Sequence, residues 1–255
     1  MSARLVSIHR YPVKGFSPET LDAVTLEAGR FFPGDRLYAV ENGPCGFDPA
    51  APAYKQKTDF LVLMRNARLA ALRTSFDPDT RVFTLHHEGA ELARGDLSMP
   101  EGRAAVETAL SAYMGKEQRG PLQVLEAPEG HRFTDSLRSG FVSLLNLASV
   151  RDLEARMGVA LDPLRFRMNL HLDGWEPGAE LEMAGREITV GAVRLKILKR
   201  TERCAATSVD PETGIRDLNV VKGLMQAYGH TDCGVYAKVL AGGRIAPGDA
   251  VSLPA

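Results

Sequence analysis

The stretch KILKRTERCAATSVDPETG, from Lys196 to Gly214, determines how the chain is interpreted. It begins as an apolar strand pattern, places four cationic side chains before a single cysteine, Cys204, and continues into a polar Asp-Pro turn. Positive neighbours favour the thiolate form of a cysteine, which is both a nucleophile and a soft metal ligand. The same pattern also fits a buried, inert cysteine beside a solvated cationic strand face. The stretch alone leaves both interpretations open.

Composition sets the class of protein. The chain has 255 residues, with 31 Lys and Arg against 32 Asp and Glu, and 44% of its residues are hydrophobic. This is ordinary globular composition, sufficient for one large domain or two smaller ones. The near-zero net charge argues against a general nucleic-acid or anionic-membrane binder. No apolar run is long enough to span a bilayer, and the start enters a strand pattern without a signal-peptide core, so we expect a cytoplasmic protein.

Three cysteines, Cys45, Cys204 and Cys233, limit the redox chemistry. An odd and low count is typical of a reducing compartment and excludes a disulfide framework. Three thiolates are too few for an all-cysteine iron–sulfur cluster, which needs four. No dinucleotide-binding glycine fingerprint is present either. Any electron-transfer chemistry would therefore have to take its electrons from another protein or from a bound cofactor.

Periodicity predicts a mixed α+β, β-dominated fold. Strand patterns occur at 4–13, 21–26, 36–40, 61–64, 69–75, 81–87, 164–172, 187–190, 193–198, 204–209 and 235–240. Helix patterns occur at 101–114, 150–157 and 220–228, with capping boxes expected at Ser98/Glu101 and Ser149/Asp152 and glycine stops at Gly115, Gly158 and Gly229. The stretch 125–140, rich in Pro, Gly, Ser and charge, marks the expected boundary between an N-terminal domain, 1–122, and a C-terminal domain, 123–255.

Four motifs then point to a family. Arg203-Cys204-x-x-Thr207-x-Val209-Asp210-Pro211-x-Thr213-Gly214 resembles the core motif of MOSC domains, named for the C-terminal domain of molybdenum-cofactor sulfurase. Tyr11-Pro-Val-Lys14-Gly15 and Gly34-Asp35-Arg36 resemble motifs of the N-terminal β-barrel domain that accompanies MOSC, and Arg165-Phe-Arg167-x-Asn169 resembles a MOSC strand motif. The resemblance covers almost the whole chain. It implies a β-barrel-like N-terminal domain, a C-terminal MOSC β-barrel with peripheral helices, and a cofactor in the cleft between them.

Within this family the chain resembles the mitochondrial amidoxime-reducing component and its bacterial counterparts. That resemblance implies a molybdopterin-type molybdenum cofactor and reduction of small N-hydroxylated compounds, with Cys204 as the metal ligand and a catalytic residue. The cofactor contacts that it implies are Lys14, Arg36, Ser139, Arg167, Asn169, Arg203, Cys204, Thr207 and Tyr236. The residue chemistry agrees, because Arg and Lys suit a phosphate, Asn suits a polar ring edge and a thiolate suits a soft metal. Asp210, near Cys204, is a candidate catalytic proton carrier, and an Asp-Pro turn explains it equally well.

The sequence departs from the family pattern at Met168, where relatives usually have Pro, and after Asp135, where the usual small loop is missing. We expect electrons to come from a separate donor protein, a ferredoxin or a cytochrome with its own reductase. An alternative remains open at this point. Cys204 would carry sulfur as a persulfide, or the site would bind the cofactor for delivery without redox turnover. A cofactor-free interaction module would leave the cationic motifs of both halves unrelated to each other.

Overall fold

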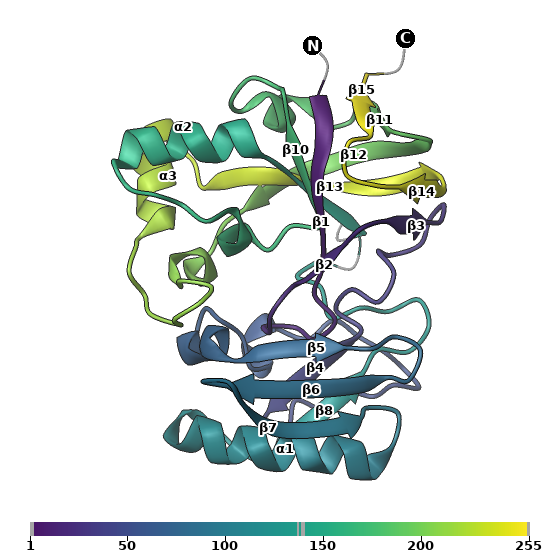
Figure 1. Cartoon of the computed structure of the whole chain (residues 1–255), viewed down its shortest axis with the longest axis vertical. Helices are drawn as coiled ribbons and strands as arrows, with labels where there is room; N and C mark the ends of the chain where they lie inside the picture. Colours follow the sequence, from purple (N-terminus) through teal and green to yellow (C-terminus); the bar gives the residue numbers. More distant parts are fainter. Residues whose placement is uncertain (1–2, 137, 139–140, 254–255) are drawn as a thin grey trace.

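The larger part of the molecule is a closed β-barrel. The computed structural model describes residues 3–136, 138 and 141–253. Seven strands close on themselves in the order β1, β10, β9, β13, β12, β11 and β15, in the upper part of Figure 1. Their bounds are β1 (Ala3–Arg10), β9 (Val142–Asn146), β10 (Leu170–Asp173), β11 (Glu187–Val190), β12 (Val193–Glu202), β13 (Asp232–Ala241) and β15 (Ala250–Ser252). Closure removes the exposed edges that an open sheet would present.

Alternation along the strands fills the barrel interior. In β12 the side chains of Val193, Leu195 and Ile197 are buried, while Arg194 and Lys196 between them are exposed. This period of two is expected for a strand with one face on a core and the other in water. The buried residues of the barrel strands form one apolar cluster, which includes residues from both ends of the chain. The barrel therefore forms only when the first and last strands have met.

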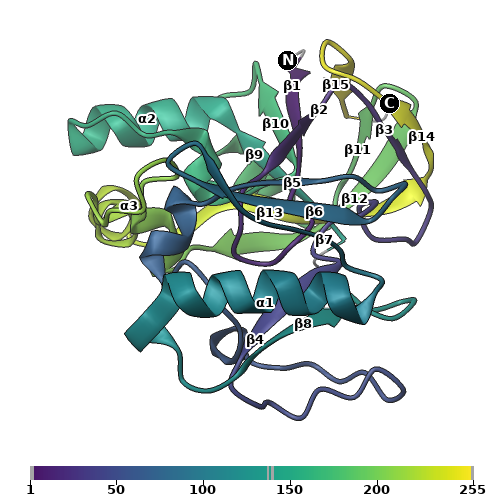
Figure 2. The ribbon, with the colours of Figure 1, turned by 60° about the horizontal axis from the view of Figure 1, so that its bottom comes forward.

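The smaller part consists of two short sheets and a helix. Strands β4 (Tyr38–Asn42) and β8 (Leu122–Glu126) form an antiparallel pair, and β5 (Arg73–Phe76), β6 (Val82–His87) and β7 (Ala90–Asp96) form an antiparallel sheet. Helix α1 (Pro100–Met114) packs against β7 and β8 and covers the end of the molecule farthest from the barrel (Figures 1 and 2). Its buried residues Val106, Leu110 and Met114 repeat every four positions, as one helical face requires.

The first strands of the chain belong to the barrel. β1 pairs with β10 and β15, and β2 (Glu19–Leu21) pairs with β1. β3 (Val24–Leu26) pairs with β14 (Gly243–Ile245) near the other end of the chain. The chain therefore begins in the barrel, crosses to the smaller part and returns. Strands of the segments 1–122 and 123–255 therefore pair with one another in the same sheets.

Helices α2 (Leu147–Met157) and α3 (Val220–Tyr228) lie together at one side of the barrel (Figure 1). Six 3₁₀ turns connect the other elements in the described part of the chain: η1 (Lys57–Asp59), η2 (Ala67–Ala71), η3 (Gly115–Glu117), η4 (Pro163–Phe166), η5 (Ala179–Met183) and η6 (Ala205–Ser208). The expected β-dominated α+β class is confirmed. Among the described residues, no helix combines the length and the apolar character needed to cross a membrane.

Four expected strands are wrong in whole or in part, and they lie close to the site. Residues 204–209 contain the turn η6 (Ala205–Ser208) in place of a strand, and in this turn the backbone N–H of Thr207 donates to the carbonyl of Cys204. Residues 164–166 belong to η4, so the expected strand 164–172 begins only at Leu170. Residues 61–64 run into a turn closed on the carbonyl of Val62. The expected strand 69–75 likewise starts with η2 and becomes extended only in β5.

The expected capping box of α1 is also wrong. The helix is capped at Met99 without a side-chain cap, and the hydroxyl of Ser98 donates to Asp96 at 2.6 Å instead of capping the helix. Glu101 therefore lies in the first turn without a reciprocal partner there. Gly115 ends the helix with a positive φ, as expected.

The start of α2 differs in the same way. Asn146 caps the helix through its side-chain oxygen, three residues before the expected Ser149. Ser149 instead donates to the buried carboxylate of Glu180 at 2.8 Å, so it is used for packing against η5. Gly158 closes α2 in the left-handed region, and Gly229 does the same for α3, both as expected.

Candidate functional site

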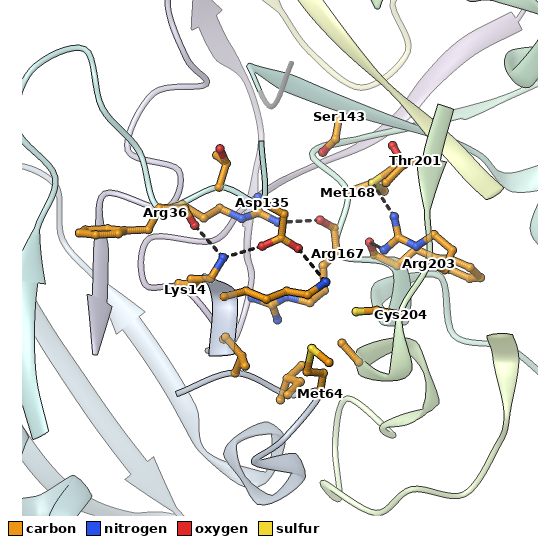
Figure 3. A pocket seen from close by; sticks show the side chains of 18 of the residues that line it. Lys14, Arg36, Met64, Asp135, Ser143, Arg167, Met168, Thr201, Arg203 and Cys204 are labelled. Carbon is orange, nitrogen blue, oxygen red and sulfur yellow. Dashed lines mark hydrogen bonds and ion pairs between the residues drawn. The ribbon is translucent and has the colours of Figure 1, made fainter. Parts of the chain in front are cut away.

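One cavity lies where the barrel meets the smaller part of the molecule. It encloses about 900 Å³, part of it open to solvent. Charged side chains from both parts line it: Lys14, Arg36, Lys57 and Asp135 from the first 136 residues, and Arg165, Arg167 and Arg203 from later elements. Figure 3 shows Lys14, Arg36 and Asp135 on one side of this space and Arg203 and Cys204 on the other. The cavity thus has two ends of different chemistry.

Cys204 stands at one end, where β12 gives way to η6. Its side chain is partly exposed and lines the cavity. The carbonyl of Cys204 accepts both the backbone N–H of Thr207, at 3.0 Å, and the Thr207 hydroxyl, at 2.9 Å. These bonds fix the turn that presents the thiol. Cys204 and its neighbours Arg203 and Lys57 are called the thiol end below.

Lys57 and Arg203 surround the thiol with positive charge. Burial would lower the pKa of Lys57, but the Asp135 carboxylate and the Cys204 thiol together raise it, so the ammonium group stays protonated. Arg203 donates to the carbonyl of Phe166 and, at 3.6 Å, to the sulfur of Met168. Met168, the residue that departs from the family pattern, is therefore a buried support for Arg203.

Lys14 stands at the opposite end and is almost fully buried. Its ammonium donates to the carbonyl of Phe133 at 2.9 Å and to the carboxylate of Asp135 at 2.6 Å. Burial lowers the pKa of Lys14, and Asp135 opposes that effect. Gly15 allows this geometry, because a Cβ there would lie 2.6 Å from the carbonyl oxygen of Leu61.

Two arginines complete this end in an unusual backbone conformation. Arg36 and Arg167 both have positive φ, 47° and 54°, a region that non-glycine residues rarely adopt. Arg36 donates to Asp35 at 2.5 Å and to the carbonyl of Arg167 at 2.8 Å. Such strain concentrates at functional sites, where surrounding contacts maintain it. Lys14, Arg36 and Arg167 are called the anion end below.

The electrostatics of the two arginines differ. Burial would lower the pKa of Arg36, but the carboxylate of Asp35 raises it above its usual value. Burial lowers the pKa of Arg167 to about 10, because the described residues place no carboxylate in contact with its guanidinium. The anion end thus contains one guanidinium that is paired with a carboxylate, that of Arg36, and one that is not, that of Arg167.

Several buried polar atoms at the cavity lack a partner among the described residues. They belong to the cavity-lining residues Thr134 (Oγ1), Arg165 (Nε), Arg167 (Nη2), Thr201 (Oγ1) and Arg203 (Nε). Buried polar groups are almost always hydrogen-bonded, and each exception needs an explanation. Unpaired N–H and O–H groups collected around one cavity indicate a polar, acceptor-rich ligand.

The structure brings most of the predicted site residues to this one cavity. Those that line it are Lys14, Arg36, Arg167, Asn169, Arg203, Cys204 and Tyr236. Thr207 is buried behind Cys204 and does not line the cavity, and Ser139 lies outside the described residues. The side-chain amide of Asn169 donates one N–H to the carbonyl of His9, and its oxygen accepts from Ser143. Its second N–H therefore remains for a ligand.

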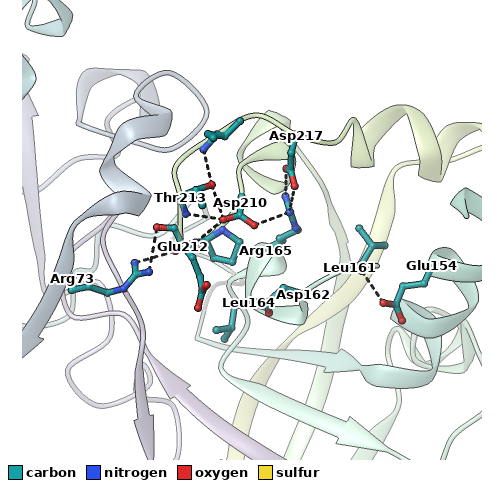
Figure 4. A network of polar contacts seen from close by, with 12 residues as sticks. Arg73, Glu154, Leu161, Asp162, Leu164, Arg165, Asp210, Glu212, Thr213 and Asp217 are labelled. Atoms are coloured by element: carbon teal, nitrogen blue, oxygen red, sulfur yellow. Dashed lines mark hydrogen bonds and ion pairs between the residues drawn. The ribbon is translucent and has the colours of Figure 1, made fainter. Parts of the chain in front are cut away.

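Asp210, the candidate proton carrier, is not among the residues that line the cavity. One of its carboxylate oxygens accepts from the backbone of Glu212 and from the backbone and hydroxyl of Thr213. The other lies 3.2 Å from the guanidinium of Arg165, which also binds Asp217 at 2.7 Å (Figure 4). These contacts favour the structural explanation of Asp210, in which it closes the turn and supports Arg165.

Sequence reasoning did not select Lys57, Arg165 or Asp135 as site residues. Arg165 and Asp135 stood inside quoted motif segments, and their charge was an available signal. Lys57 lies in a loop far from every motif and carried no such signal. It begins the turn η1, and only the tertiary fold brings it to the cavity.

Family comparisons agree with this architecture. The MOSC N-terminal beta barrel domain matches residues 2–121, and the MOSC domain matches residues 134–252. The chain therefore belongs to the MOSC domain proteins, a family associated with binding of the molybdenum cofactor.

Two curated relatives share part of the sequence. Mitochondrial amidoxime-reducing component 1 of Mus musculus is 36% identical over 74 residues, which is 29% of this chain and 21% of the relative. The Homo sapiens protein of the same name is 35% identical over 72 residues, 28% of this chain and 21% of the relative. The matched region thus spans about a fifth of the length of these relatives.

The solved structures that match this chain include the YuaD protein from Bacillus subtilis. It is 11% identical, with a TM-score of 0.46, over 98% of this chain and 94% of that chain. YiiM from Geobacillus stearothermophilus is 20% identical, with a TM-score of 0.35, over 45% of this chain and 54% of that chain.

The residues of the cavity fit the cofactor that the family implies. A molybdopterin carries a phosphate and a polar pterin, which together need cations and N–H or O–H donors. The anion end supplies the cations, and the unpaired buried atoms supply donors. The thiol end supplies a soft sulfur ligand at the other side of the same space.

Proposed function

We propose that this chain binds a molybdopterin-type molybdenum cofactor in the cavity and reduces small N-hydroxylated compounds. One observation carries the proposal: a partly exposed thiol, Cys204, shares a cavity with buried cations and unpaired donors that suit a phosphate and a pterin. The partial similarity to two proteins named for amidoxime reduction supports the substrate class.

Each end of the cavity has its own task in this proposal. Lys14, Arg36 and Arg167 would hold the phosphate, and Cys204 would supply the thiolate ligand to the metal. Asn169 and Tyr236 also line the cavity, where a pterin ring would find an amide donor and an apolar surface, and Arg203 at the thiol end would add N–H donors. When bound, the molybdenum centre supplies the two-electron redox chemistry that breaks an N–O bond.

The chain itself would orient the reactants and supply charge and protons. The Lys57 ammonium stays protonated beside Cys204 and gives a cationic N–H donor at the thiol end of the cavity. The overall reaction converts an N-hydroxy compound, two electrons and two protons to the N–H compound and water. The protein's part is to orient the reactants and to stabilise the thiolate, as for most cofactor enzymes.

The electrons would come from a separate donor, a small ferredoxin or a cytochrome with its reductase. The chain has three cysteines, which cannot build a four-thiolate cluster, and no dinucleotide fingerprint. Electron-transfer encounters are usually small, below ~1,200 Å² of buried surface, so we expect transient docking.

The test begins with the full chain purified from a host that makes molybdopterin. Elemental analysis should find about one molybdenum per chain, and reduced viologen, which replaces the donor protein, should drive reduction of an aromatic amidoxime to the amidine. Molybdenum-loaded protein that never turns over with viologen would overturn the reductase proposal and favour a carrier of sulfur or cofactor. Sustained turnover with NADH alone would contradict the need for a donor protein.

A further inference from the structure

Tyr11 touches the anion end from behind the cavity wall. Its side chain is fully buried, and it is not among the residues that line the cavity. The guanidinium carbons of Arg36 and Arg167 both lie 4.4 Å from the centroid of its ring. The two carbons are therefore at most twice that distance apart. The Tyr11 ring thus contacts two cations that come from distant parts of the sequence.

The two arginines depend on this ring to different degrees. Arg36 also has Asp35 and the carbonyl of Arg167 as partners, at 2.5 and 2.8 Å. The guanidinium of Arg167 makes no hydrogen bond or ion pair within the described ranges 3–136, 138 and 141–253, and its Nη2 is buried without a partner. The contact with Tyr11 is therefore the main interaction that holds the Arg167 side chain in place.

An aromatic ring is suited to this task. Its face carries negative electrostatic potential and attracts a guanidinium, and the contact consumes none of the N–H donors. The guanidinium groups of Arg36 and Arg167 carry like charges and repel each other. Attraction of both groups to the Tyr11 ring offsets part of that repulsion. The free N–H groups of Arg167 stay available for a ligand.

The phenol group itself is not needed for this contact. The Tyr11 hydroxyl is buried and has no partner among the described residues. The backbone, by contrast, is firmly held: Tyr11 N–H donates to Asp35 at 2.8 Å, and Arg36 N–H donates to the Tyr11 carbonyl at 2.7 Å. The ring, and not the hydroxyl, is the part that faces the two cations.

We propose that Tyr11 is a positioning residue of the anion end: its ring holds the Arg167 guanidinium beside that of Arg36, so that both face one anionic group in the cavity. The inference rests on the proposed function in one respect, that this group is the phosphate of the cofactor. It assigns a role to a residue that touches neither the cofactor nor the reacting atoms.

The test uses inorganic phosphate as the probe and the full chain from a host that lacks molybdopterin. Calorimetric titration at fixed ionic strength gives the phosphate Kd of the wild type and of the Tyr11→Phe, Tyr11→Leu and Arg167→Met variants. We expect Tyr11→Phe to bind within about twofold of the wild type, because it keeps the ring. Tyr11→Leu and Arg167→Met should each weaken binding about tenfold.

Coupling separates positioning from general packing. If the ring acts through Arg167, Tyr11→Leu should weaken phosphate binding no further in the Arg167→Met background, because interacting residues give non-additive effects. Additive losses in the double variant would overturn the proposal. So would a Tyr11→Leu variant that binds phosphate like the wild type, or a Tyr11→Phe variant as weak as Tyr11→Leu.

A second series of variants keeps the proposal testable if Tyr11→Leu does not fold. Phenylalanines with increasing ring fluorination at position 11 keep the shape of the ring and withdraw charge from its face. We expect the phosphate Kd to rise with each fluorine, and a flat series would reject the role of the ring. A wild type that binds no phosphate would instead overturn the phosphate site of the proposed function, whereas unaffected Tyr11 variants would leave that site intact.

Discussion

The anion end and the thiol end of the cavity are built differently. Lys14 is buried, Arg167 is partly buried, and the two come from distant parts of the chain. Two of the three cations at this end adopt left-handed backbone conformations. Cys204 is partly exposed and sits on one short turn held by Thr207. Binding at the anion end requires both parts of the molecule to be in place. The position of the thiol itself depends on one local segment, to which Lys57 adds a charge from a distant part of the sequence.

Charge compensation differs as well. Asp135 pairs with Lys14, and Asp35 pairs with Arg36, so much of the anion end's positive charge is already balanced. Among the unpaired donors at the cavity, those of Arg167 and Arg203 lie at opposite ends. We infer that the anion end determines affinity for the cofactor and the thiol end determines turnover. The following predictions test whether these two properties can be changed independently.

The largest effect is expected at the thiol end. Cys204→Ser replaces the soft sulfur ligand by a hydroxyl, so turnover should be abolished, while the unfolding free energy and phosphate binding at the anion end stay near those of the wild type. Viologen-driven amidoxime reduction and phosphate titration measure the two properties separately. Activity above about a tenth of wild type, with molybdenum retained, would count against Cys204 as the metal ligand.

Cys45→Ser is the matched control for this variant. Cys45 does not line the cavity, and burial raises the pKa of its thiol to about 11. Its replacement should leave turnover and molybdenum content unchanged. A loss as large as that of Cys204→Ser would show that the two cysteines are not functionally distinct.

The next largest effect is expected for Lys14→Ala at the anion end. A hydrogen bond to a charged group contributes ~1.5–3 kcal/mol, so cofactor affinity should fall roughly ten- to a hundredfold. Molybdenum per chain after extensive dialysis measures the loss. Lys116→Ala, at an exposed position away from the cavity, is the control and should keep the cofactor. If Lys14→Ala keeps a full complement, the assignment of the anion end is wrong.

The two ends were not equally accessible to sequence reasoning. Cys204 and Arg203 lie in one continuous motif, so a single stretch was enough to find them. Lys14, Arg36 and Arg167 were found through short motifs, and the structure brings all three to one cavity. Their roles stay predictions until tested. Lys57 was missed, because its position depends on a loop that no local pattern describes.

Local pattern failed where tertiary contacts determine the backbone. Arg167 has a left-handed conformation between η4 and β10, so a strand expected over 164–172 could not run through it. Residues 204–209 contain apolar and β-branched side chains, yet the bonds from Thr207 to Cys204 close a turn. Helix 220–228, by contrast, has a local cap and a local glycine stop, and it was predicted correctly.

A smaller effect is expected from pH at the anion end. Burial lowers the pKa of Arg167 to about 10, so its charge is complete at pH 8 and is lost as pH rises through 10. Phosphate affinity should therefore fall severalfold between pH 8 and 10.5. Burial also lowers the pKa of Lys14, which loses charge in the same range, so Arg167→Met should bind phosphate weakly and show a smaller fall than the wild type. Because burial disfavours the cation, its loss stabilises the fold, so unfolding of this site is not the cause. A flat wild-type profile would contradict the prediction.

The smallest effect on turnover is expected for Asp210→Asn. Burial would raise the pKa of Asp210, but hydrogen bonds from Thr213 and Glu212 and the nearby Arg165 lower it, so the carboxylate stays ionised at neutral pH. An ionised carboxylate outside the cavity lining is poorly placed to deliver a proton. We expect turnover within about threefold of the wild type.

Stability, not rate, should respond to this change. An asparagine can keep one acceptor oxygen but loses the charge that strengthens the bonds to Thr213 and Arg165, so the unfolding free energy should fall by about 1 kcal/mol. Asp217→Asn removes the charge from the other carboxylate that holds Arg165, at 2.7 Å, and should lower stability by a similar amount. Urea unfolding and viologen-driven turnover measure the two quantities side by side. A loss of turnover beyond tenfold in Asp210→Asn but not in Asp217→Asn would restore Asp210 as a proton carrier and extend the thiol end beyond the turn of Cys204.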